Sequence, residues 1–284
     1  MSKRSFLFAS FLCSMISITL CAGAKTSTPA PKQPDKPRPR LEVHYEKSQH
    51  RIAIVNREPG PYTFTFRFQP YENVRSSCGN PCTLSLYSGV HYIHLAKIDP
   101  LQRWRFKYRY RYRRGDYQAQ IQRKHIYELP YARGANYKMG QAYNGSFTHK
   151  GDYRYALDFR LPLGTPIHAA RAGKVIWTVD QFTDGGIEDR YKGRDNRVEV
   201  LHNDGTVARY GHMQRHGVKV KPGQQVKAGD LLGLSGTTGY SKGPHLHFHV
   251  YHPVNGERSV TIPTLFRTHR GLEILKTGNT YRRP

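Results

Sequence analysis

Three histidines spaced two residues apart stand near the C-terminal end of the sequence. His245, His247 and His249 alternate with apolar residues within residues 243–250. Because a β-strand sends alternate side chains to the same face, a strand here would project the three imidazoles together. Imidazole is a frequent zinc ligand and the commonest proton carrier near neutral pH. A polar, solvated strand face is the simpler interpretation, so a site of chemistry requires further residues.

Those further residues lie upstream, in two groups. His149 and Asp158 precede a Pro-Leu-Gly-Thr-Pro turn at residues 162–166. A catalytic zinc ion usually takes three protein ligands and keeps a fourth position open. His149, Asp158 and one histidine of the downstream strand would complete such a set. Another histidine, His212, follows the strand-like residues 198–210, and we expect it to end that strand.

Residues 129–250 resemble the lysostaphin/LytM family of zinc metallopeptidases, which cut the peptide part of peptidoglycan. Three blocks in the family's order carry the resemblance, at residues 149–166, 210–213 and 238–248. A glycine-punctuated hairpin sequence at 220–233 lies between the last two. The resemblance implies a zinc-dependent endopeptidase that hydrolyses peptidoglycan stem peptides or cross-links by attack of a zinc-bound water.

The family's motifs imply a role for five residues. By resemblance, His149, Asp158 and His247 are the ligands of one zinc ion per chain. His212 and His245 are the catalytic residues, and they would divide proton transfer and oxyanion stabilisation between them. Histidines in turns and basic segments are expected at the surface rather than at a metal: His168, His202, His216, His252 and His269.

Two features depart from the family's pattern. The interval of nine residues between His149 and Asp158 is longer than in the family's short first motif, and it contains Asp152. Asp158 is favoured over Asp152 because Phe159 and the Pro-Leu-Gly-Thr-Pro turn follow it. His249 stands where relatives usually carry Glu or Gln. We interpret it as a solvated or hydrogen-bonded strand residue, with support of a metal ligand as the alternative.

The N-terminus has the features of a secretory signal peptide. Lys3 and Arg4 precede a largely apolar run at residues 5–20, and the Ala-Gly-Ala sequence at 22–24 fits a cleavage site. The apolar run is too short to be a membrane span. We therefore expect residues 1–24 to be a signal peptide that directs the chain across the inner membrane. A single cysteine pair and no wall-anchoring module after the peptidase blocks favour the periplasm.

Only Cys78 and Cys82 remain once the signal peptide is removed with Cys13 and Cys21. Their spacing suits a small disulfide loop in an oxidising compartment. A metal site is not favoured for this pair, because no second pair of ligands lies nearby.

The predicted fold class is mainly β, with an N-terminal β-sandwich-like domain followed by a LytM-type antiparallel β-sheet peptidase domain. Short alternating runs punctuated by Asn, Gly and Pro predict an all-β accessory domain over residues 41–122. The resemblance implies that residues 123–266 are the peptidase domain, with its site in a groove along the sheet. The Pro-rich, basic residues 25–40 are expected to be a disordered linker, and residues 267–284 a basic C-terminal tail.

Residues 103–114 alternate between aromatic and basic side chains, which predicts a strand with one aromatic and one positive face. An edge strand protected by charge is the favoured interpretation, and a ligand-binding strip is the alternative. The whole chain has 45 basic and 20 acidic residues, a net charge of +25, or +23 without Lys3 and Arg4. Such charge attracts polyanions. For an exported chain these are an anionic wall or outer-membrane lipid, and nucleic acid is not expected.

Two other functions compete with the active enzyme. One is a non-catalytic LytM-type scaffold that binds the cell wall and activates amidases. Such relatives typically lack some ligands, whereas the set is complete here. The other is a cationic binding protein for nucleic acid or lipid, which leaves the metal-ligating residues unexplained.

Overall fold

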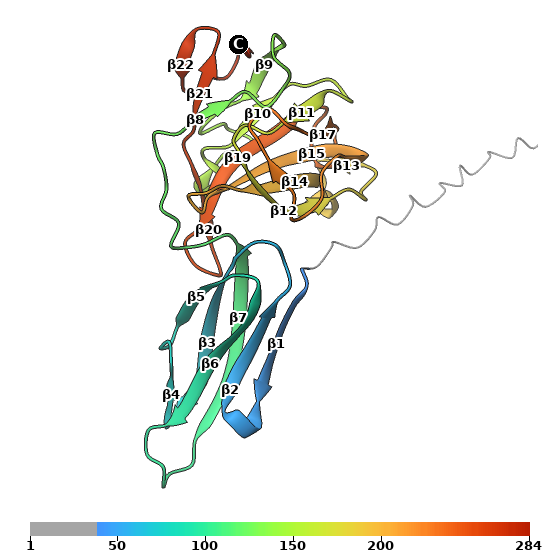
Figure 1. Ribbon diagram of the computed structural model, residues 1–284. Coiled ribbons are helices and arrows are strands. Elements are labelled where there is room, and N and C mark those ends of the chain that lie inside the picture. The colour runs from blue at the N-terminus through green and yellow to red at the C-terminus, as the bar shows by residue number, and fades with distance from the viewer. Residues whose placement is uncertain (1–38) are drawn as a thin grey trace, which may run out of the picture. The chain divides into compact units, whose positions relative to one another are not determined.

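The computed structural model describes residues 39–284 (Figure 1). The predicted signal peptide and nearly all of the predicted linker lie outside the described residues. The described chain is almost entirely β, with three short 3-10 helices: Lys47–Gln49, Gly151–Tyr153 and Asp189–Tyr191. The prediction of a mainly β fold is confirmed. No helix within these residues has the length and apolar character needed to cross a membrane.

Two antiparallel sheets form from the first seven strands (Figure 1). One has the order β1-β2-β6-β4 and the other the order β5-β3-β7. Ile52 and Ile54 of one sheet share a fully buried core with Phe64 and Phe66 of the other. The two sheets therefore pack face to face, as predicted for a β-sandwich. Their strands are β1 Leu41–Glu46, β2 Arg51–Asn56, β3 Tyr62–Glu72, β4 Val74–Ser76, β5 Cys82–Leu86, β6 Gly89–Lys97 and β7 Arg105–Arg114.

Strand β7 is the edge strand of its sheet, as the sequence predicts. Its basic side chains are mostly exposed, while the aromatic side chains between them are half-buried against the sandwich core. Tyr110, for example, packs on Phe66 with ring centroids 5.4 Å apart. The aromatic face thus stabilises the sandwich, and the basic face remains open to solvent.

Cys78 and Cys82 form a disulfide, which confirms that prediction. Cys82 is the first residue of β5 and is fully buried. The disulfide therefore ties the loop that follows β4 to the core.

A large antiparallel sheet carries the predicted site residues. Its main path has the order β16-β12-β14-β15-β19-β10-β9-β23, to which β11, β17 and β20 are joined. Its strands are β9 Asn136–Gln141, β10 Leu157–Phe159, β11 Pro166–His168, β12 Gly173–Val179, β14 Asn196–Leu201, β15 Val207–Val218, β16 Gln225–Val226, β17 Leu231–Ser235, β19 Leu246–Pro253, β20 Ser259–Ile262 and β23 Thr280–Arg282. Short accompanying strands are β8 Ile126–Glu128, β13 Gly185–Gly186, β18 Gly239–Tyr240, β21 Leu265–Thr268 and β22 Gly271–Glu273.

Alternation along the central strands separates a core face from a site face. Phe159 of β10, Tyr210 of β15 and Phe248 of β19 are fully buried in one cluster. Burying a side chain of this size contributes roughly 1.5–3 kcal/mol, so these rings fix the three strands against each other. Their strand neighbours Asp158 and His247 consequently face the opposite side of the sheet.

Residues 267–284 are not a free tail, in contrast to the expectation from their basic composition. Strand β23 pairs with β9, and Tyr281 is fully buried in the core of the large sheet. The hydroxyl of Tyr131 donates to the backbone oxygen of Tyr281 at 2.6 Å. The remaining domain boundaries proposed from the sequence stay predictions.

A buried ion pair joins β7 to β14. Arg114 Nη2 donates to Glu199 Oε1 at 3.2 Å, and the Glu199 side chain is 1% exposed. The hydroxyl of Tyr251 also donates to this carboxylate, at 3.2 Å. Burial raises the pKa of Glu199, but the charges of Arg114 and Arg197 outweigh it and lower the pKa to about 2.

Replacement of Glu199 by Gln is expected to lower the free energy of unfolding by about 3–5 kcal/mol, because it leaves buried cations without their partner. The folded pKa lies below its ordinary value of 4.5. The stabilisation is therefore present above about pH 4.5 and is lost as the pH falls toward 2. Urea unfolding gives the free energy of unfolding of wild type and Glu199→Gln. The difference between the two proteins should be smaller at pH 3 than at pH 7. A variant as stable as the wild type at pH 7 would contradict this account.

Candidate metal centre and active site

Strand pairing brings the three predicted zinc ligands together. Asp158 of β10 pairs directly with His247 of β19, and His149 enters from the loop before the helix Gly151–Tyr153. His149 Nε2 lies 3.2 Å and His247 Nδ1 2.9 Å from Asp158 Oδ1. One ligand atom of each residue lies within 4.8 Å of the others. Residues 39–284 contain no second group of this kind.

His149 has the hydrogen bonding expected of a metal ligand. Its Nδ1–H donates to the carbonyl oxygen of Ala142 at 3.0 Å, which places the proton on Nδ1 and leaves a lone pair on Nε2. The side chain is 0% exposed, and its Nε2 lone pair faces Asp158 Oδ1 at 3.2 Å without a hydrogen bond, because both atoms are then acceptors. Leaving a buried polar atom unsatisfied is unfavourable, and a metal ion would satisfy it. The residues present therefore fit a zinc ion.

The protonation of the other two residues also suits a cation. Burial raises the pKa of Asp158, but the neighbouring imidazoles of His149 and His247 outweigh burial and hold the pKa well below its usual range. Burial lowers the pKa of His247, which favours its neutral form. An ionised carboxylate and a neutral imidazole are the forms that bind metals.

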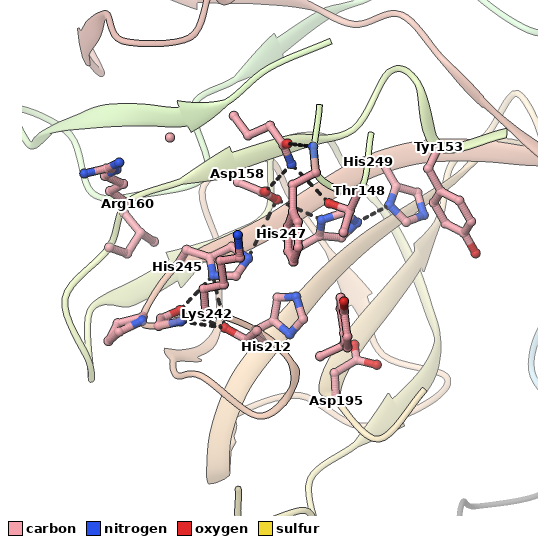
Figure 2. A pocket seen from close by; sticks show the side chains of 18 of the residues that line it. Thr148, Tyr153, Asp158, Arg160, Asp195, His212, Lys242, His245, His247 and His249 are labelled. Carbon is pink, nitrogen blue, oxygen red and sulfur yellow. Dashed lines mark hydrogen bonds and ion pairs between the residues drawn. The ribbon is translucent and has the colours of Figure 1, made fainter. Parts of the chain in front are cut away.

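Two further side chains support this cluster, of which only Gln141 was not considered from the sequence. Gln141 of β9 donates from Nε2 to Asp158 Oδ2 at 3.0 Å and to Thr148 Oγ1 at 3.1 Å. His249 Nδ1 lies 2.9 Å from His247 Nε2, and His249 is only 3% exposed. Of the two forms of the interpretation, His249 is a hydrogen-bonded strand residue and not a solvated one. The His249 ring contacts His247 at Nε2, the His247 nitrogen that faces away from Asp158 (Figure 2).

Asp152 lies outside the cluster. Its carboxylate pairs with Arg258, whose Nη2 is 2.7 Å from Oδ1. The structure thus brings Asp158, and not Asp152, to the histidines. Among the histidines expected at the surface, the prediction for His202 is wrong, because this residue is 3% exposed and donates from Nδ1 to the carbonyl oxygen of Ala172 at 2.9 Å.

The two predicted catalytic histidines lie beside the cluster and next to each other. The rings of His212 and His245 have centroids 4.5 Å apart. His212 Nδ1–H donates to the carbonyl oxygen of Thr238 at 2.7 Å, and His245 Nδ1–H donates to that of Gly243 at 2.8 Å. Both rings therefore keep Nε2 as the atom available for proton transfer. Burial, aided by the charge of His245, lowers the pKa of His212 to about 3.

The sequence suggested that His212 ends its strand, and this prediction is wrong. Strand β15 continues to Val218, and Gly211 and His212 form a bulge between the pairs Val198–Tyr210 and Asn196–Met213. His212 has a φ of 62°, in the left-handed region that residues other than glycine rarely adopt. A bulge of this kind bends a strand and changes the direction of one side chain, here that of a groove residue.

An ion pair in the same groove lining as His212 was also not predicted from the sequence. Arg209 Nη2 lies 2.8 Å from each carboxylate oxygen of Asp195. Burial raises the pKa of Asp195, but Arg209 and Arg197 outweigh it and hold the pKa far below its usual range. No motif marks these residues, because only the register of β14 and β15 brings them to the site.

A groove with a volume of about 980 Å³ runs over the site. Its lining includes Asp158, His212, His245, His247 and His249, all of which are seen in Figure 2. The walls add aromatic and basic side chains: Phe147, Tyr153, Tyr240, Arg160, Lys192 and Lys242. A peptide chain in this groove would thus pass directly over the proposed metal ligands.

Part of the chain is similar to known proteins. The sequence profile of Peptidase family M23 matches residues 152–260. Lysostaphin of Staphylococcus simulans is 37% identical over 115 residues, which cover 40% of this chain and 21% of lysostaphin. Peptidoglycan DD-endopeptidase ShyA of Vibrio cholerae is 35% identical over 105 residues, which cover 36% of this chain and 22% of ShyA. Among solved structures, lysostaphin from Staphylococcus simulans aligns with a TM-score of 0.33 and 30% identity, covering 46% of this chain and 50% of that chain.

The matched part of the chain is a peptidase domain. Residues 152–260 are a domain of Peptidase family M23. This range contains Asp158, His212, His245 and His247, and His149 stands three residues before it. The chain spans about a fifth of the length of these two relatives.

Proposed function

We propose that the protein is a zinc-dependent endopeptidase that hydrolyses peptide bonds in the stem peptides or cross-links of peptidoglycan. The observation that carries the proposal is the cluster of His149, Asp158 and His247, in which the buried Nε2 of His149 faces the carboxylate of Asp158 at 3.2 Å. His212 and His245 stand beside this cluster with their Nε2 atoms available. Metal ligands and proton-transfer groups are thus present together in one groove.

Each part of the site has a chemical task. When bound, zinc would act as a Lewis acid toward the scissile carbonyl and the attacking water. His212 and His245 move the proton of the water to the departing amine and hydrogen-bond the developing oxyanion. Their Nδ1–H bonds to backbone carbonyls fix both rings, so that the same nitrogen of each always faces the reaction. The hydrogen bond between His247 and His249 likewise holds a predicted ligand in place.

The substrate class is inferred from the relatives. Lysostaphin is similar to this chain, and so is a protein described as a peptidoglycan DD-endopeptidase. The complete set of ligands and catalytic histidines disfavours a non-catalytic scaffold that activates amidases. We propose export across the inner membrane and action in the periplasm, on the basis of the N-terminal sequence.

Mass spectrometry of peptidoglycan tests this function. Purified sacculi are incubated with the zinc-loaded mature protein, and the soluble peptides are compared with those of a sample without it. We expect new peptide termini, whose masses identify the bond that is cut, and no release when a chelator is present. Unchanged sacculi would contradict the proposed activity.

The exposed basic face of β7 supports a second contact with the wall. Lys107, Arg109 and Arg111 are exposed and form no ion pair with any residue in the described part of the chain. Arg105, by contrast, pairs with Glu72 at 2.6 Å. We propose that the three unpaired cations help to hold the protein on anionic wall polymers or lipid.

Binding to purified sacculi is expected to weaken steeply with salt, because the screening length shortens to roughly 3 Å at 1 M. Replacing Lys107, Arg109 and Arg111 together with Gln should weaken binding and leave cleavage of a short soluble substrate unchanged. The matched control removes the same charge elsewhere, at Lys219, Lys221 and Lys227, which are also exposed. Salt-independent binding, or equal loss in the two triple variants, would contradict a role for this strand. Co-sedimentation measures all three proteins.

A further inference from the structure

Two cationic side chains in the groove have no carboxylate beside them. Arg160 and Lys242 both line the groove and are exposed. Neither forms an ion pair with any residue between 39 and 284. A third groove cation, Lys192, differs from them because its Nζ lies 2.7 Å from Asp189.

The acidic residues of the groove cannot neutralise these two charges. Asp158 is surrounded by the histidines of the proposed metal centre, and Asp195 is held by Arg209. No other Asp or Glu lines the groove. A ligand that enters the groove therefore meets an uncompensated positive charge.

Arg160 lies near His245 through strand pairing, and Lys242 precedes His245 by three residues and lines the same groove. Arg160 directly follows β10, two residues beyond Asp158, and both side chains line the groove. Phe159 of β10 pairs with Leu246 of β19. Because the strands are antiparallel, the residue after Phe159, Arg160, comes opposite the residue before Leu246, His245. Figure 2 shows Arg160 on the opposite side of the proposed metal centre from Tyr153 and His249.

An aromatic stack holds Lys242 at the wall of the groove. Lys242 Nζ lies 3.8 Å from the centroid of the Phe147 ring, and this ring stacks on Tyr240 at 5.7 Å and 13°. Lys192 lies over the other member of the pair, 5.5 Å from the Tyr240 centroid. A cation held on an aromatic ring loses less conformational freedom on binding than a free lysine side chain does.

We propose that Arg160 and Lys242 form a carboxylate-binding subsite at the His245 end of the groove. The inference rests on the proposed peptidase function and names its substrate class: peptides with a free carboxylate near the scissile bond. Charge-assisted hydrogen bonds from guanidinium and ammonium groups favour a carboxylate over the carboxamide of the same size. An amidated peptide, or an uncharged oligoglycine chain, would leave both cations without a partner.

Two synthetic substrates test this subsite. One is a cross-linked stem-peptide dimer with its carboxylates free, and the other is the same dimer with those carboxylates converted to carboxamides. For the wild-type protein we expect kcat/KM to fall about 10-fold or more on amidation, mainly through KM, because a charged hydrogen bond is lost. Fluorescence anisotropy of both labelled dimers should show the same difference in affinity.

The variant Arg160→Gln/Lys242→Gln should remove this difference. It is expected to lose about 10-fold in kcat/KM on the free dimer and so to cut the free and the amidated dimer with similar kcat/KM. Circular dichroism shows whether the variant is folded. The control Lys219→Gln/Lys221→Gln carries the same charge change outside the groove lining and should still discriminate.

Equal binding of both dimers by the wild type would overturn the subsite, as would equal losses on both dimers in the groove variant. Failure to cut either dimer would instead contradict the proposed activity. The anisotropy measurement then still decides whether the subsite exists, because it requires no turnover.

Discussion

Replacing His247 with alanine is expected to abolish stable zinc binding while the protein remains folded. His247 contributes the nitrogen closest to Asp158, whereas His245 Nε2 lies farther from the same oxygen, at 3.8 Å, and is not in the group of three. Loss of a side chain that merely supports a ligand typically lowers metal affinity roughly 10–100-fold, so loss of a ligand should exceed this. Metal analysis after dialysis, together with competition against a chromophoric chelator, measures the effect. Circular dichroism reports whether the sheet persists.

The two neighbouring aspartates provide a matched control. Asp158→Ala should lose zinc in the same way, whereas Asp152→Ala should keep it, because Asp152 pairs with Arg258 outside the cluster. Zinc retained at full occupancy by His247→Ala would show that the ligand assignment is wrong. Loss of zinc from Asp152→Ala and not from Asp158→Ala would show that Asp152, and not Asp158, is the ligand.

The sequence was informative where a repeating pattern determines which side chains share a face. Alternation along residues 103–114 predicted an edge strand with an aromatic and a basic face, and β7 has both. The same rule placed His245 and His247 on one face, and both line the groove. The upstream members of the site came from the resemblance of motifs, since alternation says nothing about residues on distant strands.

What the sequence did not reveal depends on register and on local backbone geometry. Gln141 reaches Asp158 only because β9 pairs with β10, and the alternation of one strand does not specify its neighbour. The bulge at His212 could not be foreseen, because a positive φ is uncommon at any residue other than glycine. The C-terminal strand β23 has three residues, too few to show a period, and only its pairing with β9 reveals its place.

Replacing His212 or His245 with alanine is expected to leave zinc in place and to lower kcat by about 10² or more, the usual scale for a lost proton-transfer or oxyanion group. Neither side chain belongs to the cluster of proposed ligands, although both line the same groove. Turnover of a soluble stem-peptide substrate and zinc content are measured on the same preparations. His216→Ala is the matched control, because His216 is on β15 with His212 but is exposed outside the groove lining.

The combination of the two measurements distinguishes a catalytic residue from a ligand. A variant that keeps zinc and loses turnover has lost a proton-transfer or oxyanion group, as we expect for both histidines. A variant that loses zinc along with turnover would make that histidine a ligand, and the set of three would have to be revised. Turnover near the wild-type rate in either variant would remove that residue from the mechanism. Since the Nδ1 atoms of both rings are held by backbone carbonyls, the two Nε2 atoms are the groups that these variants remove from the reaction.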